Sequence, residues 1–320
     1  MNVNLKKCFH LILVFGTVLY LSACAVVMAD TEDVVTRSFN VSEGGKLTMD
    51  VSRASIDVET EKGNLVKVRV VLKAGTSDED KAREVFEKYD IDFKHSGDDV
   101  TIKTDCPRHR GIFSWFGGNR LRVRFIVTVP EKYDLDLKTS GGSISISDIE
   151  GDVKSKTSGG SLKLEFVKGP VWGRTSGGSI RLEGCSGDAR LRTSGGSIRI
   201  GKVEGTVNAH TSGGSVTVEE VMGTIDASTS GGSVSASISK QPEGDCSLKT
   251  SGGTVTVRLA KNIKVDVDAK TSGGRVHSDF PVTMEVRGEI SKRKLQGKIN
   301  GGGPELFLRT SGGSIKIKEI

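Results

Sequence analysis

Apolar and polar residues alternate in short runs along most of the chain, and the runs return at a fixed interval. A Thr-Ser-Gly-Gly tetrad heads each unit, and the first six tetrads are 18 residues apart. The tetrads begin at Thr139, Thr157, Thr175, Thr193, Thr211, Thr229, Thr250, Thr271 and Thr310. With Thr139 as position zero, apolar residues stand at positions five and seven (Ile144, Ile146) and at ten and fourteen (Ile149, Val153). Each unit therefore predicts two short strands joined by two glycine corners.

Two architectures fit a unit of two strands. One is a hairpin meander with antiparallel neighbours, and the other is a β-solenoid in which each coil stacks on the previous one. Stacking places each residue against its own copy in the next coil, so the repetition of the whole unit favours the solenoid. We therefore predict an all-β fold, a single-stack β-solenoid of two-strand coils of 18–21 residues. At about 4.8 Å per strand the rod would be roughly 45 to 50 Å long.

The tetrad itself is interpreted as a structural corner. Gly-Gly permits backbone angles that other residues avoid, and Thr and Ser hydroxyls can hydrogen-bond the turn or its stacked copies. The last coil ends at Ile320 with no evident cap. End-to-end self-association of rods is therefore a further hypothesis.

The part of the chain before the repeat is less regular. Residues 39–130 predict N-terminal coils, and residues 131–320 form the repeat domain. One short helix is predicted over 77–89, with Ser77 and Asp80 as a capping box, and it would cover the exposed first edge of the stack. A linker is predicted over 24–38, and an aromatic loop over 106–120.

The first residues read as a targeting segment. Lys6 and Lys7 precede an apolar run over 11–19, which is short for a membrane span. The sequence LSAC at 21–24 resembles the bacterial lipobox, which predicts a signal peptide over 1–23 and a lipidated, palmitate-bearing Cys24. Secretory cleavage after Ala29 is the alternative and would discard Cys24. Both readings export the mature protein from the cytoplasm. The favoured lipidated form would be anchored in the bacterial cell envelope, at the outer membrane or cell surface rather than in the cytoplasm.

Composition narrows the class of protein. The chain is 35% hydrophobic with 41 glycines, as expected of a folded repeat protein, and its net charge of +6 does not indicate a nucleic-acid binder. Two of the five cysteines lie in the targeting segment, and the remaining three are an odd number, so no disulfide framework is predicted. Cys185 and Cys246 fall in apolar positions of the repeat, where we expect small buried side chains.

Three stretches carry a family resemblance. They are FNVSEGGKLTMDV over 39–51, VTVPEKYDLDLKTSGGSISI from Val127, and LQGKINGGGPELFLRTSGGSIKI near the end. The chain resembles the bacterial "putative adhesin" proteins, which are envelope β-solenoids. The resemblance covers nearly the whole mature chain and implies the fold. It transfers no catalytic residue, because its motifs are turns and strand patterns.

Residues able to perform chemistry are scattered. We predict no catalytic residues, no cofactor and no metal site, since the histidines lack a metal-ligand spacing and no nucleophile elbow or phosphate loop is present. Asp148, Glu150 and Asp152 are the nearest match to the acidic cluster of a polysaccharide lyase. They lie at one corner with no similar cluster in the next coil, and solvation of the corner is the preferred interpretation. A non-enzymatic protein is therefore predicted.

Basic residues follow one outward position of the repeat, the residue before each tetrad threonine. Residues 151–200 hold nine cationic and four anionic side chains, whereas 201–250 hold three and six. The predicted anion-binding patch consists of Lys154, Lys156, Trp172, Arg174, Arg190 and Arg192. Stacked like charges with an exposed Trp suit an anionic polymer or a membrane surface. The alternative is a solvated strand face whose charges prevent aggregation.

The aromatic loop is the second candidate site. Arg110, Phe113, Trp115 and Phe116 combine cations with aromatic rings, as in a membrane interface or a surface that docks a protein partner. The loop could equally fold back and plug the end of the solenoid. The sequence thus predicts an adhesin-like or scaffold lipoprotein that binds anionic polymers or a membrane surface. The alternative function is a structural or signalling protein that docks a partner through this loop.

Overall fold

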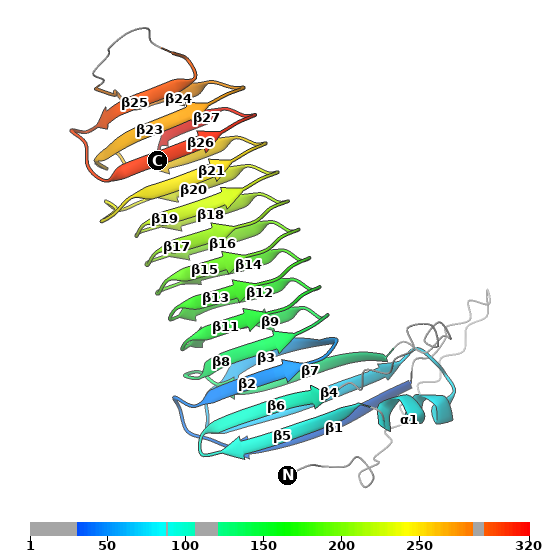
Figure 1. The fold of residues 1–320 in the computed structure, drawn as a ribbon. Coiled ribbons are helices and arrows are strands. Elements are labelled where there is room, and N and C mark those ends of the chain that lie inside the picture. Colours follow the sequence, from blue (N-terminus) through cyan, green and yellow to red (C-terminus); the bar gives the residue numbers. More distant parts are fainter. Residues whose placement is uncertain (1–30, 88, 106–120, 284–290) are drawn as a thin grey trace, which may run out of the picture.

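The computed structural model describes residues 31–87, 89–105, 121–283 and 291–320. Two long sheets lie face to face and form a rod with the core between them (Figure 1). Sheet A has 14 strands, in the spatial order β1 (Thr31–Asn40), β4 (Leu65–Ala74), β7 (Leu121–Pro130), β3 (Ala54–Glu61), β9 (Ile144–Ile146), β12 (Leu162–Lys168), β14 (Ile180–Cys185), β16 (Ile198–Val203), β18 (Val216–Val221), β20 (Val234–Ile238), β22 (Val255–Leu259), β27 (Ile315–Glu319) and β24 (Val276–Ser278), with β10 (Ile149–Glu150) beside β12.

Sheet B lies opposite and has 13 strands. Their spatial order is β25 (Lys294–Ile299), β23 (Val265–Thr271), β26 (Glu305–Thr310), β21 (Cys246–Thr250), β19 (Ile225–Thr229), β17 (Val207–His210), β15 (Ala189–Arg192), β13 (Val171–Arg174), β11 (Val153–Lys156), β8 (Asp134–Thr139), β2 (Lys46–Val51), β6 (Asp99–Asp105) and β5 (Asp90–Ser96). One helix, α1 (Glu79–Glu87), lies beside the N-terminal end of the rod.

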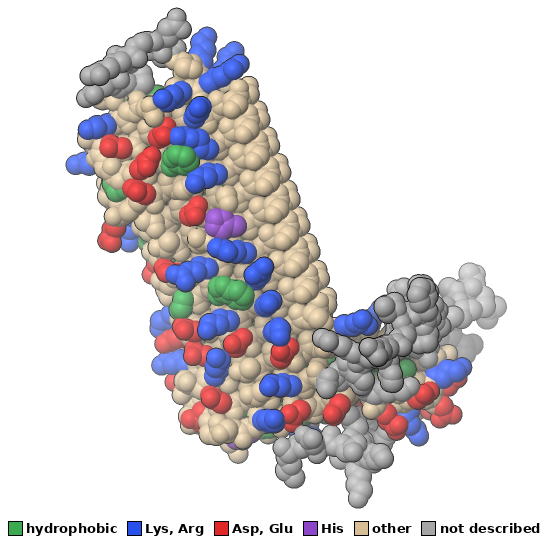
Figure 2. Space-filling view, viewed as in Figure 1, with side chains coloured by type: hydrophobic (Ala, Val, Ile, Leu, Met, Phe, Trp, Pro, Cys, Tyr) green, Lys and Arg blue, Asp and Glu red, His purple; other side chains and the backbone are tan. Residues whose placement is uncertain are grey.

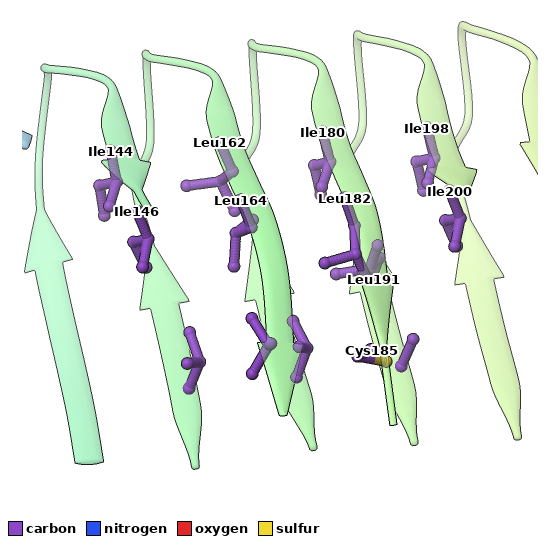
Figure 3. Packing of buried hydrophobic residues seen from close by; sticks show 14 of the residues in the cluster. Ile144, Ile146, Leu162, Leu164, Ile180, Leu182, Cys185, Leu191, Ile198 and Ile200 are labelled. Carbon is purple, nitrogen blue, oxygen red and sulfur yellow. The ribbon is translucent and has the colours of Figure 1, made fainter. Parts of the chain in front are cut away.

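The predicted solenoid is confirmed by the strand register. Strands of successive repeats pair in parallel, and equivalent positions lie opposite one another, so that Ile144, Leu162 and Ile180 are direct partners. A meander would have made these neighbours antiparallel. The alternating apolar residues point inward and form continuous columns of buried side chains (Figure 3). Cys185 and Cys246 occupy such columns, as predicted, and are 0% and 1% exposed.

The tetrad is confirmed as a structural corner, although its glycines are needed for a reason other than the predicted one. The Thr175 hydroxyl donates to the Gly160 carbonyl of the previous coil at 2.7 Å, and Thr157, Thr193 and Thr211 make the equivalent bond to a tetrad glycine. The backbone angles of the tetrad glycines lie outside the left-handed region. Instead, a Cβ on Gly178 would lie 2.1 Å from the Gly160 carbonyl oxygen, so the corners stack too closely for any side chain.

The N-terminal end differs from the expected row of opening coils. The coil of β2 and β3 lies between β6/β7 and β8/β9, and antiparallel strands β1, β4 and β5 complete the two sheets. Residues 31–38, predicted as linker, belong to β1, whose ten residues all pair with β4. One side of β1 is only half-buried, which explains why its apolar alternation is weak in sequence.

Helix α1 follows the predicted segment but has a different cap. Asp78, rather than Ser77, precedes the helix, and its carboxylate accepts the Lys81 backbone N–H at 3.2 Å. Hydrogen bonding and charge from Lys81 hold the pKa of Asp78 below its usual value. The helix contacts β4 and the edge strand β1 and buries Ala82 and Phe86. It therefore supports the first edge together with the antiparallel strands.

The last coil in the sequence is not the last coil of the rod. The final strands β26 and β27 are inserted between β21/β22 and β23/β24. The outermost strand of sheet B is β25, which pairs antiparallel with β23. Ile320 therefore lies inside the stack order, and the hypothesis of end-to-end association loses the observation that motivated it.

Candidate anion-binding face

The outward face of sheet B carries two rows of side chains that run along the rod. The corner row contains the residue before each tetrad threonine: Lys138, Lys156, Arg174, Arg192, His210, Ser228, Lys249, Arg309 and Lys270. The mid-strand row lies two residues earlier in each strand: Asp136, Lys154, Trp172, Arg190, Asn208, Asp226, Ser247, Phe307 and Asp268. Figure 2 shows Lys and Arg side chains in succession along the length of the rod.

The six residues of the predicted anion-binding patch lie together on β11, β13 and β15. We call them the basic patch: Lys154, Lys156, Trp172, Arg174, Arg190 and Arg192. All six side chains are exposed. Arg190 makes one long ion pair with Asp188, at 4.0 Å. The other four cations of the patch form no ion pair with any residue that the structure describes. Their charges are therefore not neutralised by the described residues.

Trp172 stands at the centre of the basic patch. Its side chain is 38% exposed, and none of the described cations lies over its ring. It borders a shallow surface hollow of about 380 Å³, whose lining includes Asp152, Lys154, Pro170 and Arg190. The patch thus combines an open aromatic ring with cations on both neighbouring strands.

A second group with the same layout lies near the C-terminal end of the rod. Phe307 and Arg309 on β26 occupy the positions that Trp172 and Arg174 have on β13. Here the Arg309 guanidinium lies 3.8 Å from the centre of the Phe307 ring, and it pairs with Asp268 at 2.5 Å. Burial raises the pKa of Asp268, but the hydrogen bond and charge of Arg309 outweigh it and leave this pKa below its usual value. We call Phe307, Arg309, Asp268, Lys249 and Lys270 the closed group.

His210 lies between the two groups in the corner row. Its Nδ1 is 2.6 Å from the Ser228 hydroxyl, and its Nε2 is 3.8 Å from the Asp226 carboxylate. Burial lowers the pKa of His210; Asp226 opposes this effect, and the charges of Arg192 and Lys249 add to it. The surroundings of His210 therefore favour its neutral imidazole over the charged form.

Basic residues on sheet A form a shorter row with internal partners. Lys163, Arg181 and Arg199 lie opposite one another, as the repeat predicts. Lys163 pairs with Glu165 at 2.7 Å, and Arg181 pairs with Glu183. This row therefore carries less uncompensated charge than the basic patch.

Two of the three acidic residues at the corner, Asp148 and Glu150, are held by structural contacts. Asp148 accepts the Phe166 backbone N–H at 2.8 Å, and Glu150 pairs with Lys168 at 2.8 Å. The hydrogen bond from Lys168 lowers the pKa of Glu150. These contacts join successive coils and agree with the interpretation of the cluster as a corner feature.

Other groups able to perform chemistry are buried or dispersed. Burial raises the pKa of the Cys185 thiol to about 12, so this thiol is not a nucleophile at neutral pH. Among the residues that the structure describes, no three His, Cys, Asp or Glu side chains gather as metal ligands, and no helix is both long and apolar enough to span a membrane.

Several predicted site residues lie outside the described residues. They are the lipidation site Cys24 and the aromatic-loop residues Arg110, Phe113, Trp115 and Phe116. Their roles stay predictions.

The structure also shows a hollow that the sequence did not reveal. It measures about 540 Å³ and lies on sheet A, where β1, β4 and β7 meet. Its lining includes Arg69 and Arg122, together with the ion pair between Arg124 and Asp57 at 2.6 Å. These strands pair antiparallel outside the repeat, so no periodic signal in the sequence places their side chains side by side.

Comparison with protein-family models agrees with the fold. The Toastrack DUF4097 family model matches residues 45–318. Solved structures similar to the chain include a "putative cell adhesion protein" of Clostridium sporogenes, with 17% identity, 91% of this chain and 100% of that chain covered, and a TM-score of 0.24. A "putative adhesin" of Bacteroides fragilis is also similar, with 12% identity, 90% of this chain and 97% of that chain covered, and a TM-score of 0.35. A "putative lipid binding protein" of Parabacteroides distasonis has 16% identity, 90% and 97% of the two chains covered, and a TM-score of 0.34. No curated protein matches the chain.

Proposed function

Because the chain belongs to the Toastrack DUF4097 family, whose domain has no assigned function, we propose its function from its own surface. The protein is a non-enzymatic binding module of the bacterial cell envelope. It holds linear polyanions along the basic patch of sheet B. The lipobox-like sequence at 21–24 supports the envelope location, with Cys24 as the lipid anchor.

The observation that carries this proposal is the row of cations without internal partners. Lys156, Arg174 and Arg192 lie directly opposite one another on adjacent strands. Like charges at strand spacing repel each other, and an anionic partner removes that repulsion. A polymer suits the arrangement better than a small anion, because the stack repeats the same cation about every 4.8 Å along the rod.

The test is co-sedimentation of the purified chain with insoluble anionic polymers at low and moderate salt. We expect binding that weakens steeply as salt rises, since the contacts are exposed charges. The double variant Arg174→Glu, Arg192→Glu should lose it. Arg181→Glu, Arg199→Glu is the matched control, because it makes the same change in net charge on the adjacent strands of sheet A.

The control decides between a site and a general effect of charge. If both double variants lose binding equally, the attraction comes from the net charge of the rod and the proposal of a defined face is wrong. If the unmodified chain binds no polyanion at either salt concentration, the proposed function itself is wrong.

A further inference from the structure

We propose that the hollow beside Trp172 is a subsite for one sugar ring, and that the polyanion is therefore an acidic polysaccharide. This inference rests on the proposed function and specifies its ligand. The hollow contains the three kinds of group that bind such a sugar: an aromatic ring, a cation and a carboxylate.

The aromatic ring is available for stacking. Aromatic side chains with one open face bind the apolar face of a pyranose, and Trp offers the largest such surface. Trp172 keeps 38% of its surface exposed and has no described cation over it, whereas the ring of Phe307 is covered by Arg309. Exposure of a large aromatic side chain costs free energy, and a ligand that covers it recovers that cost.

The charged groups flank the ring on the adjacent strands. Lys154 lies directly opposite Trp172 on one side and Arg190 on the other, so a carboxylate or sulfate on a stacked sugar has a cation on either side. The Asp152 carboxylate also lines the hollow, and it has no hydrogen-bond partner among the described residues. It can accept a sugar hydroxyl, which a polymer of phosphates does not offer.

The repeat of the rod also suits a sugar chain. Adjacent strands lie about 4.8 Å apart, close to the length of one pyranose unit. A chain that stacks one sugar on Trp172 can thus place neighbouring charged units beside the next strands. Arg174 and Arg192 in the corner row border this path.

The experiment compares three polyanions with different backbones and one neutral polysaccharide. Polygalacturonate and dextran sulfate are acidic sugars, long-chain polyphosphate is an anion without rings, and dextran is neutral. We expect Trp172→Ala to weaken polygalacturonate binding about tenfold, which corresponds to about 1.4 kcal/mol, and to leave polyphosphate binding unchanged. Trp172→Phe should restore most of the loss, because it retains an aromatic face.

Phe166→Ala is the matched control variant. Phe166 lies in the same coil as Trp172 and is similarly exposed, at 41%, but it points outward from sheet A. Its removal should not change the binding of any probe. In a Trp115→Phe background Trp172 is the single tryptophan, and its fluorescence should change with polygalacturonate but not with polyphosphate.

The results separate this inference from the function on which it rests. Equal binding of polyphosphate and polygalacturonate, with no effect of Trp172→Ala, would overturn the sugar subsite and leave the polyanion-binding function standing. Failure of all three polyanions to bind would overturn both. Loss of binding in Phe166→Ala as large as in Trp172→Ala would also overturn the subsite, since the effect would then come from the stability of the coil.

Discussion

The basic patch and the closed group occupy equivalent positions on sheet B but differ in how their charges are satisfied. Each has an aromatic residue followed two positions later by an arginine, and a cation on the preceding strand of the corner row. The position across from the aromatic ring on the next strand is Arg190 in the basic patch and Asp268 in the closed group. In the closed group Asp268 binds the arginine, which lies over the ring.

This difference shows that the number of cations alone does not determine how many charges remain without a partner inside the protein. The closed group has three cations, but one carboxylate and one ring engage its central arginine inside the protein. Exposed ion pairs contribute little stability, yet they determine whether a charge is available to a ligand. We therefore expect the two groups to differ in binding although the same backbone scaffold supports them.

The largest expected effect comes from breaking that shared scaffold. A Cβ on Gly178, three residues after Thr175, would lie 2.1 Å from the Gly160 carbonyl oxygen, and one on Gly313 would lie 2.2 Å from that of Gly253. Each glycine ends the tetrad that follows the arginine of its group. We expect Gly178→Ala and Gly313→Ala each to lower the free energy of unfolding by about 3 kcal/mol, measured by urea denaturation.

Binding should separate the two glycine variants. Gly178→Ala should also reduce polyanion binding, because it changes the spacing between Arg174 and its neighbours, whereas Gly313→Ala should leave binding unchanged. Gly177→Ala is the control, since its Cβ would meet the Gly159 oxygen at 3.2 Å and needs only a small adjustment. Equal loss of binding in both variants would contradict the assignment of the site to the basic patch.

The next largest effect is expected from exchanging the residues that distinguish the two groups, Arg190 and Asp268. In Arg190→Asp the introduced carboxylate lies where Asp268 lies relative to Arg309, so it should pair with Arg174. We expect polyanion affinity to fall about tenfold by sedimentation. Asp268→Arg should raise affinity, because it releases Arg309 and adds a cation beside Phe307.

Asp268→Arg changes the net charge as well as the pairing of Arg309, so a control variant must separate the two effects. Asp226→Arg alters the net charge as much as Asp268→Arg does, and it lies in the same mid-strand row. It has no aromatic residue on its own strand (β19, Ile225–Thr229). If it raises affinity as much as Asp268→Arg, the pairing of Arg309 has no influence on binding.

Much of the fold could be predicted because each repeat stacks only on its neighbours, so the pattern of one coil applies to all of them. The apolar positions of one coil, such as Ile144 and Ile146, determine the core of every coil that stacks on it. The same period correctly places Lys156, Arg174 and Arg192 side by side, since equal positions in the repeat are neighbours in a parallel stack.

The remaining features depend on strand order and on contacts that have no period. The insertion of β26 and β27 before β23 cannot be read from the chain, because sequence order and stack order agree through the preceding repeats. The pairing of Arg309 with Asp268 joins residues 41 positions apart for this reason. Likewise, β1 and β7 both pair with β4 outside the repeat, which creates the hollow around Arg69 and Arg122.

The smallest expected effect is a pH dependence centred on His210, which lies between the two groups. Burial lowers the pKa of His210, so it should gain its proton only at a lower pH than an ordinary histidine does. That proton would extend the row of Arg174 and Arg192 by one cation. Dextran sulfate keeps its charge at this pH, and its affinity should rise about two- to fivefold as the pH falls from 7 to 5.

The same protonation should weaken the fold. The unfolded state binds the proton at a higher pH than the folded state does, so the free energy of unfolding should fall as the pH drops through the histidine range. His210→Gln should flatten both the affinity and the stability profiles, because it keeps a polar partner for Ser228 without a titrating group. If affinity still rises at low pH in His210→Gln, the pH dependence comes from another group, and His210 does not extend the row of Arg174 and Arg192.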